Sequence, residues 1–319
     1  SGDIYAIPEG TVVFPREPLV KVIAPIMEAQ LVETAILNII NHQSLIATKC
    51  ARVVYAAKGD GIMEFGLRRA QGPDAGIYGA RAAMIGGCIG TSNVLTGQLF
   101  DVPVKGTHAH SWIMSFPDEY TAFKKYSELY PDACILLVDT YDTLKSGVPN
   151  AIRVFTEMRE AGIPLTFYGI RLDSGDLAYM SKKARKMLDE AGFPDAVISA
   201  SSDLDEYLIN SLKDQGAAIT SWGVGTNMIT SSDCPAFGGV YKLAAVQDEN
   251  GEFIPKIKLS ENSEKITNPG NKTVFRLYDN ETGKIRADLI ALADESYDAD
   301  KDLLIFDSIE TWKKTTLKG

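Results

Sequence analysis

The sequence predicts an α/β protein in which a parallel sheet or barrel is accompanied by a smaller, β-rich domain. From residue 116 onward, apparent helices and strands alternate, with a strand about every 20–30 residues, which is the spacing of βαβ crossovers. Gly162, Gly192 and Gly216 lie at or just past the ends of the expected helices, where left-handed caps are common. After Thr230 the pattern changes to short strands separated by hairpin signals.

The first 25 residues predict extended structure. Residues 4–7 and 11–14 are β-rich runs separated by a Pro-Glu-Gly turn, and Pro15 and Pro18 suggest edge strands or loops. We therefore expect a β-rich side domain made of residues 1–25 and 240–319, and an α/β barrel domain made of residues 26–239.

Two helices and a strand follow in the expected order. Pro25 opens a helix with apolar residues at helical spacing through residue 40, and a second helix is expected from 44 to 57. His42 lies between them and is expected to be a hydrogen-bonded core residue. Residues 62–66 predict a strand, and Asp74 is expected to cap a helix over 75–90.

The regular part of the chain predicts four further helices and strands. The expected helices cover 117–130, 149–161, 177–191 and 204–214, and the expected strands cover 134–138, 166–170, 196–199 and 219–223. The tail predicts strands over 240–246, 253–259, 273–278 and 285–292, with hairpin turns at 250–251 and 279–283.

The composition narrows the choice of partners. The 319 residues are 45% hydrophobic and 23% charged, and no apolar run reaches membrane-spanning length. The net charge of −10 argues against a nucleic acid or an anionic membrane as the partner. The cysteines are far apart in the sequence and form no metal-ligand pair, so we expect buried, reduced thiols in a cytoplasmic protein: Cys50, Cys88, Cys134 and Cys234.

The stretch from 104 to 112 is the first candidate site. Val102 and Val104 predict the end of a buried strand, and Gly106 then breaks it. The residues that follow carry hydroxyl and imidazole groups: Thr107, His108, His110 and Ser111. Such a strand end can hold a ligand, and a neutral histidine can accept a proton, a metal or a phosphoryl group. The alternative is a strand-end turn with a structural imidazole.

Four later strand ends also carry polar residues. They lie at 139–142, 171–176, 201–203 and 223–227. Because the carboxyl ends of parallel strands meet at one edge of a sheet, we expect them to form a single active-site rim.

The residue types at this rim suggest phosphate and ribose binding. Arg171 can clamp phosphate oxygens, and Asp173 can accept ribose hydroxyls or hold Mg²⁺ directly or through water. A Gly-Val-Gly-Thr run at 223–226 can cradle a phosphate, although such a motif is weak by itself. Arg68 and Arg69 suit anion capture or, alternatively, form a solvated surface pair. The sequence therefore predicts an enzyme that acts on a phosphorylated sugar.

Four runs resemble nicotinate phosphoribosyltransferases: FGLRRAQGPD at 65–74, GTHAHS at 106–111, GIRLDSGDL at 169–177 and WGVGT at 222–226. The resemblance extends from residue 2 to residue 243 with the motifs in order. It implies an irregular α/β barrel of the type II phosphoribosyltransferase kind and a homodimer with shared active sites. It also implies the synthesis of nicotinate mononucleotide and pyrophosphate from nicotinate and phosphoribosyl pyrophosphate in NAD salvage, with Mg²⁺, and with ATP as co-substrate through a phosphohistidine.

The resemblance also implies roles for single residues. His110 matches the phosphorylated histidine, near Thr107 and Ser111, whereas His108 has no such role. Arg171 and Asp173 match the pair that holds the phosphoribosyl group. The 5′-phosphate loop matches Gly223, Gly225 and Thr226, with Ser202 and Asp203 on the adjoining loop and Lys242 as a further phosphate contact. Arg68 and Ser92 match positions near the base pocket; nicotinamide-using relatives have an aspartate at the second.

The chain departs from the family pattern at its ends. We expect it to begin after an N-terminal segment whose tyrosine motif reaches the partner subunit's site, and to end short at the C-terminus. Two alternatives to the nicotinate enzyme stay open: a nicotinamide phosphoribosyltransferase, and an inactive truncated barrel that serves only as a binding or assembly module.

Overall fold

The computed structural model describes residues 2–259, 266–298, 300–307 and 309–318. The chain forms two compact units, Ser1–Leu37 with Gly239–Gly319, and Asn38–Gly238. The expected first boundary was at residue 25; in the structure, helix α1 (Ile26–Leu31) and the first residues of α2 (Glu33–Ala56) belong with the β-rich unit.

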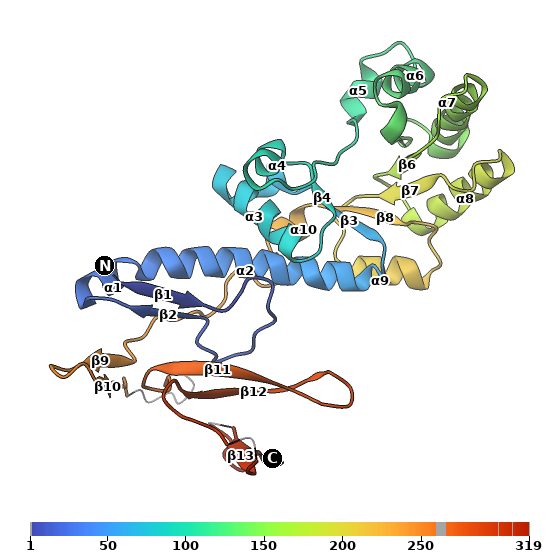
Figure 1. The fold of residues 1–319 in the computed structure, drawn as a ribbon. Helices are drawn as coiled ribbons and strands as arrows, with labels where there is room; N and C mark the ends of the chain where they lie inside the picture. The colour runs from blue at the N-terminus through green and yellow to red at the C-terminus, as the bar shows by residue number, and fades with distance from the viewer. Residues whose placement is uncertain (1, 260–265, 299, 308, 319) are drawn as a thin grey trace. The chain divides into compact units, whose positions relative to one another are not determined.

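The larger unit is built on a six-stranded parallel sheet with the order β4-β3-β8-β7-β6-β5 (Figure 1). Its strands are β3 (Gly61–Glu64), β4 (Gly90–Thr91), β5 (Cys134–Leu137), β6 (Tyr168–Leu172), β7 (Val197–Ala200) and β8 (Ser221–Val224). Strands β4 and β5 are the two edges and are not paired with each other, so the sheet forms an open half-barrel.

Five helices of this unit that follow β3 lie where the sequence predicts them, whereas the short helices at 94–100, 110–114 and 226–229 were not predicted. The helices after β3 are α3 (Pro73–Ile85), α4 (Val94–Phe100), α5 (His110–Met114), α6 (Glu119–Leu129), α7 (Val148–Glu160), α8 (Leu177–Glu190), α9 (Glu206–Asp214) and α10 (Thr226–Ile229). Three short elements supplement them: the 3₁₀ helices η1 (Leu67–Arg69) and η2 (Pro131–Ala133), and a π-helix, η3 (Thr143–Gly147). Gly162, Gly192 and Gly216 have φ of +72°, +79° and +71°, which confirms the expected left-handed caps.

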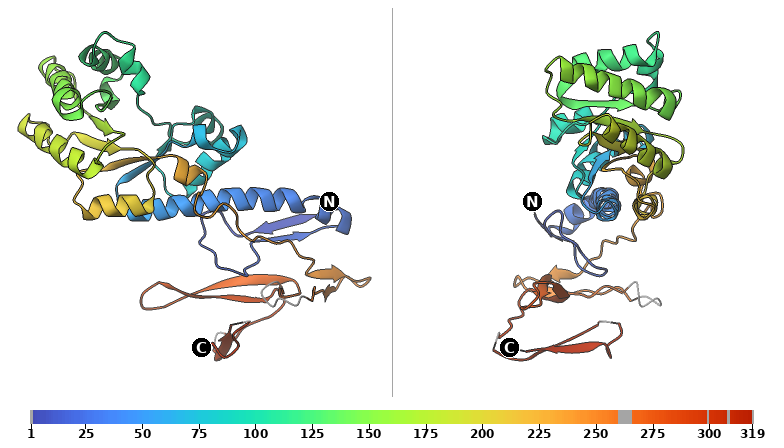
Figure 2. Two further views of the ribbon diagram at one scale, coloured as in Figure 1. Left: turned by 180° about the vertical axis from the view of Figure 1, so that it is seen from behind. Right: turned by 90° about the vertical axis from the view of Figure 1, so that its right-hand side faces the viewer.

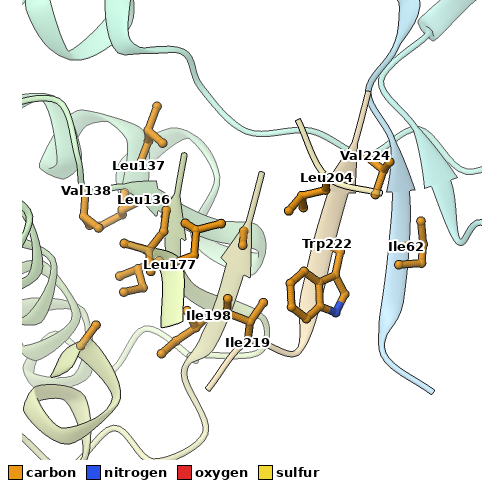
Figure 3. Close-up of a cluster of buried hydrophobic side chains, with 14 of the residues drawn as sticks. Ile62, Leu136, Leu137, Val138, Leu177, Ile198, Leu204, Ile219, Trp222 and Val224 are labelled. Atoms are coloured by element: carbon orange, nitrogen blue, oxygen red, sulfur yellow. The ribbon is translucent and has the colours of Figure 1, made fainter. Parts of the chain in front are cut away.

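The core of this unit lies against the sheet. Strand β5 is buried along its whole length, as expected for a parallel strand that is covered on both faces. Figure 3 shows Trp222 of β8 beside Ile62 of β3, with Ile198 on the next strand. The indole of Trp222 is fully buried, and its Nε1 donates to Asp60 Oδ2 at 2.8 Å, which satisfies the one polar atom of the ring.

The N-terminal part differs from the sequence-based prediction in two respects. Helix α2 runs without a break through His42, and the interruption falls at Val32. The expected hydrogen bond of His42 is absent: its Nε2 is buried without a partner among the described residues, and burial lowers the pKa of the imidazole. The expected break between two helices near His42 was wrong, because the polar residues at 41–44 lie within one continuous helix. Their side chains do not interrupt the backbone hydrogen bonds of that helix.

Strand assignment near the N-terminus was also partly wrong. β1 (Asp3–Ala6) pairs antiparallel with β2 (Val20–Ile23), whereas residues 11–14 form an exposed connection. A strand needs a partner for its backbone groups, and residues 20–23 supply that partner.

Two local predictions next to the sheet were wrong. Asp74 does not cap α3, because Gly72 occupies the N-cap with φ +105° and Pro73 follows as the first helical residue. Val102 and Val104 do not end a buried strand: Val104 is 48% exposed and forms a single parallel bridge with Thr91.

The described residues of the smaller unit form four antiparallel strand pairs, including the β1–β2 hairpin. The other three hairpins are β9 (Ala245–Gln247) with β10 (Phe253–Pro255), β11 (Lys272–Tyr278) with β12 (Ile285–Leu292), and β13 (Leu303–Phe306) with β14 (Lys314–Leu317). Figure 2 shows β11 and β12 as a long twisted hairpin. The expected strands at 240–246 and 253–259 are shorter than predicted, and the last hairpin was not predicted.

Two findings bear on membranes and thiols. Within the described ranges, no helix has both the length and the hydropathy that a bilayer span requires. All four cysteines are free, and three are buried as expected, but Cys234 is exposed. The Sγ atoms of Cys50 and Cys88 lie 3.2 Å apart, although 38 positions separate them in the sequence.

Candidate active site

Arg171, near the end of β6, is held at the centre of the rim. Its Nε donates to Ser201 Oγ at 2.9 Å, its Nη1 to Thr107 Oγ1 at 2.8 Å and its Nη2 to Asp173 Oδ1 at 3.0 Å. The side chain is 17% exposed. A guanidinium has about five N–H donors, so about two remain for an anionic ligand in a fixed orientation.

Asp173 joins this arginine to the candidate catalytic histidine. Its Oδ1 accepts hydrogen bonds from Arg171 and Ser201, and its Oδ2 lies 3.5 Å from His110 Nε2. Burial acts to raise the pKa of Asp173, but the hydrogen bond from Ser201 and the charge of Arg171 outweigh it, so the pKa lies below its ordinary value. The carboxyl group is therefore ionised at neutral pH.

His110 is the first residue of α5 and has a partner at each ring nitrogen. Its Nδ1 lies 3.0 Å from Thr140 Oγ1, and its Nε2 faces Asp173. The side chain is 39% exposed, so the imidazole is both oriented and reachable from solvent. Ser111 follows it on the same helix and is exposed.

His108 has a different position. It is 8% exposed, and its Nε2 accepts a hydrogen bond from the backbone N–H of Leu137 at 3.3 Å, on the outer edge of β5. Its ring packs against the ring of Tyr126, with 4.5 Å between the two ring centroids. Burial lowers the pKa of His108 to about 4, so the ring is neutral and can accept this bond. The structure thus gives His108 a role at the sheet edge, apart from the reactive face of His110.

Two residues at the end of β5 were expected at the rim but had no assigned role. Thr140 contacts His110, as described above, and Asp139 Oδ2 accepts from the Asp173 backbone N–H at 2.8 Å and from Ser174 Oγ at 2.6 Å. The Oδ1 atom of Asp139 is buried without a hydrogen-bond partner among the described residues. In the sequence, the signal for Asp139 and Thr140 was their position directly after an apolar strand.

The two residues expected near the base lie at neighbouring strand ends. Arg68 is in η1, just after β3, and Ser92 follows β4. These strands are parallel neighbours, with Met63 opposite Gly90 and Glu64 opposite Thr91. Both candidate side chains are exposed at the same edge of the sheet.

The predicted 5′-phosphate loop lies at the end of β8. A Cβ atom on Gly223 would lie 2.5 Å from the ring of Phe65, so this glycine makes room for an aromatic side chain. Gly225 precedes α10, and Thr226 is its first residue.

The adjoining loop carries Ser202 and Asp203, both exposed and both with positive φ, at +101° and +44°. Asn227 Nδ2 donates to the carbonyl of Asp203 at 2.8 Å, which ties this loop to α10. Lys242 is exposed and belongs to the smaller unit.

The oxygen atoms at the rim suit a hard cation better than a soft one. Within the described part of the chain, no group of three or more His, Cys, Asp or Glu side chains is arranged to hold a metal. Asp139 Oδ1 lacks a partner, and Asp173 Oδ2 is bound only loosely, at 3.5 Å. Mg²⁺ is typically held by one or two carboxylates together with substrate phosphates, so these two residues fit it.

Comparison with known structures defines the class of fold as that of the type II phosphoribosyltransferases. The crystal structure of human nicotinic acid phosphoribosyltransferase matches with a TM-score of 0.82 and 30% identity, covering 99% of this chain and 69% of that one. Nicotinate-nucleotide pyrophosphorylase from Pyrococcus furiosus matches with a TM-score of 0.72 and 26% identity, covering 93% and 70%. The expected irregular barrel is therefore confirmed, in the form of a parallel half-barrel.

The chain belongs to the nicotinate phosphoribosyltransferase family. Residues 61–276 match the Nicotinate phosphoribosyltransferase (NAPRTase) family, and residues 271–319 match the Nicotinate phosphoribosyltransferase C-terminal domain. The nicotinate phosphoribosyltransferase of Bacillus subtilis is 55% identical over 308 residues, which cover 97% of this chain and 62% of the relative. The nicotinate phosphoribosyltransferase of Homo sapiens is 34% identical over 346 residues, which cover 92% of this chain and 63% of that relative. The chain thus spans about three fifths of the length of these relatives.

Proposed function

We propose that this chain supplies the catalytic barrel of a nicotinate phosphoribosyltransferase. In this reaction the pyridine nitrogen of nicotinate forms a bond to C1 of the ribose, and the bond from C1 to pyrophosphate breaks with its electron pair leaving on pyrophosphate. The observation that carries the proposal is the cluster of His110, Asp173 and Arg171 at the sheet edge of a chain that belongs to this family.

Asp173 and Arg171 bind the phosphoribosyl group in this proposal. Positive charge develops on the ribose ring in the transition state, so a fixed carboxylate stabilises that state more than the ground state. Asp173 is held by Ser201 and Arg171, which keeps its charge in place before substrate binds. The free N–H groups of Arg171 face the anionic substituents of the sugar.

The 5′-phosphate is expected on the loops that end β7 and β8. Gly225, Thr226, Ser202 and Asp203 come together there through the hydrogen bond from Asn227 to the Asp203 carbonyl. Backbone N–H groups at the start of α10 can donate to phosphate oxygens. Gly223 supports the loop by admitting Phe65, and Lys242 is a further proposed phosphate contact.

His110 is the proposed phosphoryl acceptor. An unprotonated ring nitrogen forms a bond to the γ-phosphorus of ATP, the bond from that phosphorus to the β–γ bridging oxygen breaks, and ADP leaves. Water later cleaves the P–N bond and releases phosphate, so ATP hydrolysis is coupled to binding at the same rim. Thr107 and Ser111 lie next to it in the sequence, and Thr107 also accepts from Arg171. The competing role is a general acid that assists the departure of pyrophosphate.

Mg²⁺ is the proposed cofactor. Asp173 and Asp139 would hold it together with substrate phosphates, and the ion would neutralise negative charge on the leaving pyrophosphate. Asp139 also fixes the loop of Asp173 through the bonds to its backbone N–H and to Ser174.

The base is expected between Arg68 and Ser92. An arginine attracts the carboxylate of nicotinate, and the turn at Gly90–Asn93 contains no acidic side chain that would repel it. This favours nicotinate over nicotinamide, which remains the alternative substrate. We also propose a cytoplasmic homodimer with shared active sites, because the chain belongs to this family.

The decisive experiment is an incubation with nicotinate, nicotinamide or quinolinate, each with phosphoribosyl pyrophosphate and with or without ATP. We expect nicotinate mononucleotide, formed faster with ATP. Because of its length relative to the family, the chain is assayed as given and with any flanking sequence restored. Preference for nicotinamide would support the alternative enzyme, and no product from either form would support the inactive binding module.

A further inference from the structure

Glu64 is a buried carboxylate between the two loops that carry Arg68 and Ser92. We propose that Glu64 is a positioning residue that sets the distance between these loops and thereby the affinity for the pyridine carboxylate. The inference rests on the proposed function, because that function assigns the base to this place.

The contacts of Glu64 reach both loops. Its Oε1 accepts a short hydrogen bond from the backbone N–H of Gly66, at the start of the Arg68 loop. Its Oε2 accepts from Thr91 Oγ1 at 2.6 Å, and its carbonyl accepts from the Ser92 N–H at 3.0 Å. Thr91 Oγ1 in turn accepts from the Asn93 N–H at 3.0 Å. One residue thus joins both loops through its side chain and its backbone.

The carboxylate at this position is costly for stability. Glu64 is 0% exposed, and among the described residues its side chain has the hydrogen bonds from Thr91 and Gly66 but no charged partner. Burial raises the pKa of Glu64, although the bonds from Thr91 and Gly66 oppose this effect. A buried charge without a partner ion destabilises a fold, and an apolar residue would fill the same space at lower cost. What the carboxylate provides in return is a fixed geometry of the two loops, because it bonds to both of them.

The loops have little other regular structure to fix them. Arg68 is in a three-residue 3₁₀ helix, and Ser92 follows a two-residue strand. Without an acceptor at position 64, two buried donors, the Gly66 N–H and the O–H of Thr91, would lose their acceptor. Either loop can then shift, and the pocket for the base would change while the phosphoribosyl site on β6 and β7 keeps its own bonds.

The test compares Glu64→Ala and Glu64→Gln with Glu119→Ala. Glu119 is a matched control: it is also a buried glutamate of the same unit, its Oε2 accepts from Ser146 and Asn150, and it has no place in the proposed site. We expect Glu64→Ala to raise the KM for nicotinate about 10-fold or more and the KM for phosphoribosyl pyrophosphate less than about 3-fold. Glu64→Gln keeps an acceptor for Gly66 and should retain most of the affinity.

Hydrogen exchange gives a readout that does not require activity. In Glu64→Ala, the amides of Gly66, Ser92 and Asn93 should lose protection, whereas they should stay protected in Glu119→Ala. If Glu64→Ala does not fold, Thr91→Val removes the hydroxyl of the same link, and Thr91→Ser restores it. Lack of activity in both the chain and its form with flanking sequence would refute the proposed function, and the exchange data would still decide the role of Glu64.

Two results would overturn the inference. One is a Glu64→Ala variant in which the KM for nicotinate and the KM for phosphoribosyl pyrophosphate change by the same factor, or in which only kcat falls. A protein that is merely destabilised would behave in this way. The other is unchanged protection of the three amides.

Discussion

The Nε2 atom of His110 lies 3.5 Å from the Oδ2 atom of Asp173, while its Nδ1 is 3.0 Å from the hydroxyl of Thr140. The imidazole is therefore fixed at both nitrogens, and Nε2 is the nitrogen that faces Asp173 in the proposed sugar site. This arrangement connects the proposed ATP step to the residue that is proposed to stabilise the glycosyl transition state.

The first prediction concerns covalent labelling of His110. ATP labelled in its γ-phosphate should leave an acid-labile, base-stable label, attached at Nε2 because Nδ1 is occupied by Thr140. Amino acid analysis after alkaline hydrolysis distinguishes the two phosphohistidine isomers. The label should be absent from His110→Ala and present in His108→Gln. A label that persists without His110 would refute the mechanism, and an unlabelled protein with ATP-independent turnover would favour the general-acid role.

The second prediction concerns the charge of Asp173. Asp173→Asn should keep the fold and lower kcat roughly 10²–10³-fold, the effect of losing one electrostatic stabiliser of the transition state. Circular dichroism provides the control for folding. Near-normal turnover in a folded variant would mean that another group stabilises the ribose cation.

The third prediction concerns Ser92. Ser92→Asp places a carboxylate near the proposed position of the nicotinate carboxylate, and the repulsion should lower kcat/KM for nicotinate by about two orders of magnitude or more. Ser92→Asn, which has nearly the same size without the charge, is the matched control. Equal effects of the two substitutions would show that size, and not charge, determines the loss.

The fourth prediction concerns the pH dependence of stability through His108. Burial lowers the pKa of this imidazole to about 4, so the folded protein keeps it neutral at a pH where the unfolded chain, with a pKa near 6.5, already binds a proton. The stabilisation is present above pH 6.5 and is lost as the pH falls toward 4. Urea unfolding at pH 7 and pH 5 should show a smaller difference in His108→Gln than in the wild type.

His42 is the control for this measurement, because burial also lowers its pKa but it makes no hydrogen bond to the sheet. Removing the acceptor at position 108 with His108→Leu should in addition cost about 1–3 kcal/mol at pH 7, since the Leu137 N–H is left buried and unpaired. His42→Leu should lack this second effect. Equal losses at pH 7 in both variants would contradict the role of His108.

The sequence could predict the elements whose signals are local. Strands β5 to β8 and the helices between them follow from apolar periodicity and from glycine caps such as Gly192. The sequence also indicated the strand ends that carry Arg171 and Asp173, because polar residues directly after buried strands stand out. The structure brings these two together with His110, as a shared rim requires.

The remainder depended on contacts between distant segments. The hydrogen bond of His108 to Leu137 spans 29 positions, and nothing near His108 signals an unpaired strand edge. Residues 11–14 have strand propensity but no partner, and the partner of β1 lies at Val20–Ile23. The burial of Glu64 was also invisible, since an acidic residue at a strand end is usually read as a rim residue.

The open half-barrel leaves β5 without a strand partner on its outer side among the described residues, and an edge strand that is not covered can pair with a strand from a second molecule. The imidazole of His108 occupies one backbone donor of this boundary from the side. A foreign strand would have to displace a packed aromatic ring before it could add to the sheet. Because acidification protonates His108 and so removes its acceptor nitrogen, we expect low pH to weaken this cover of the strand edge and to promote aggregation as well as unfolding.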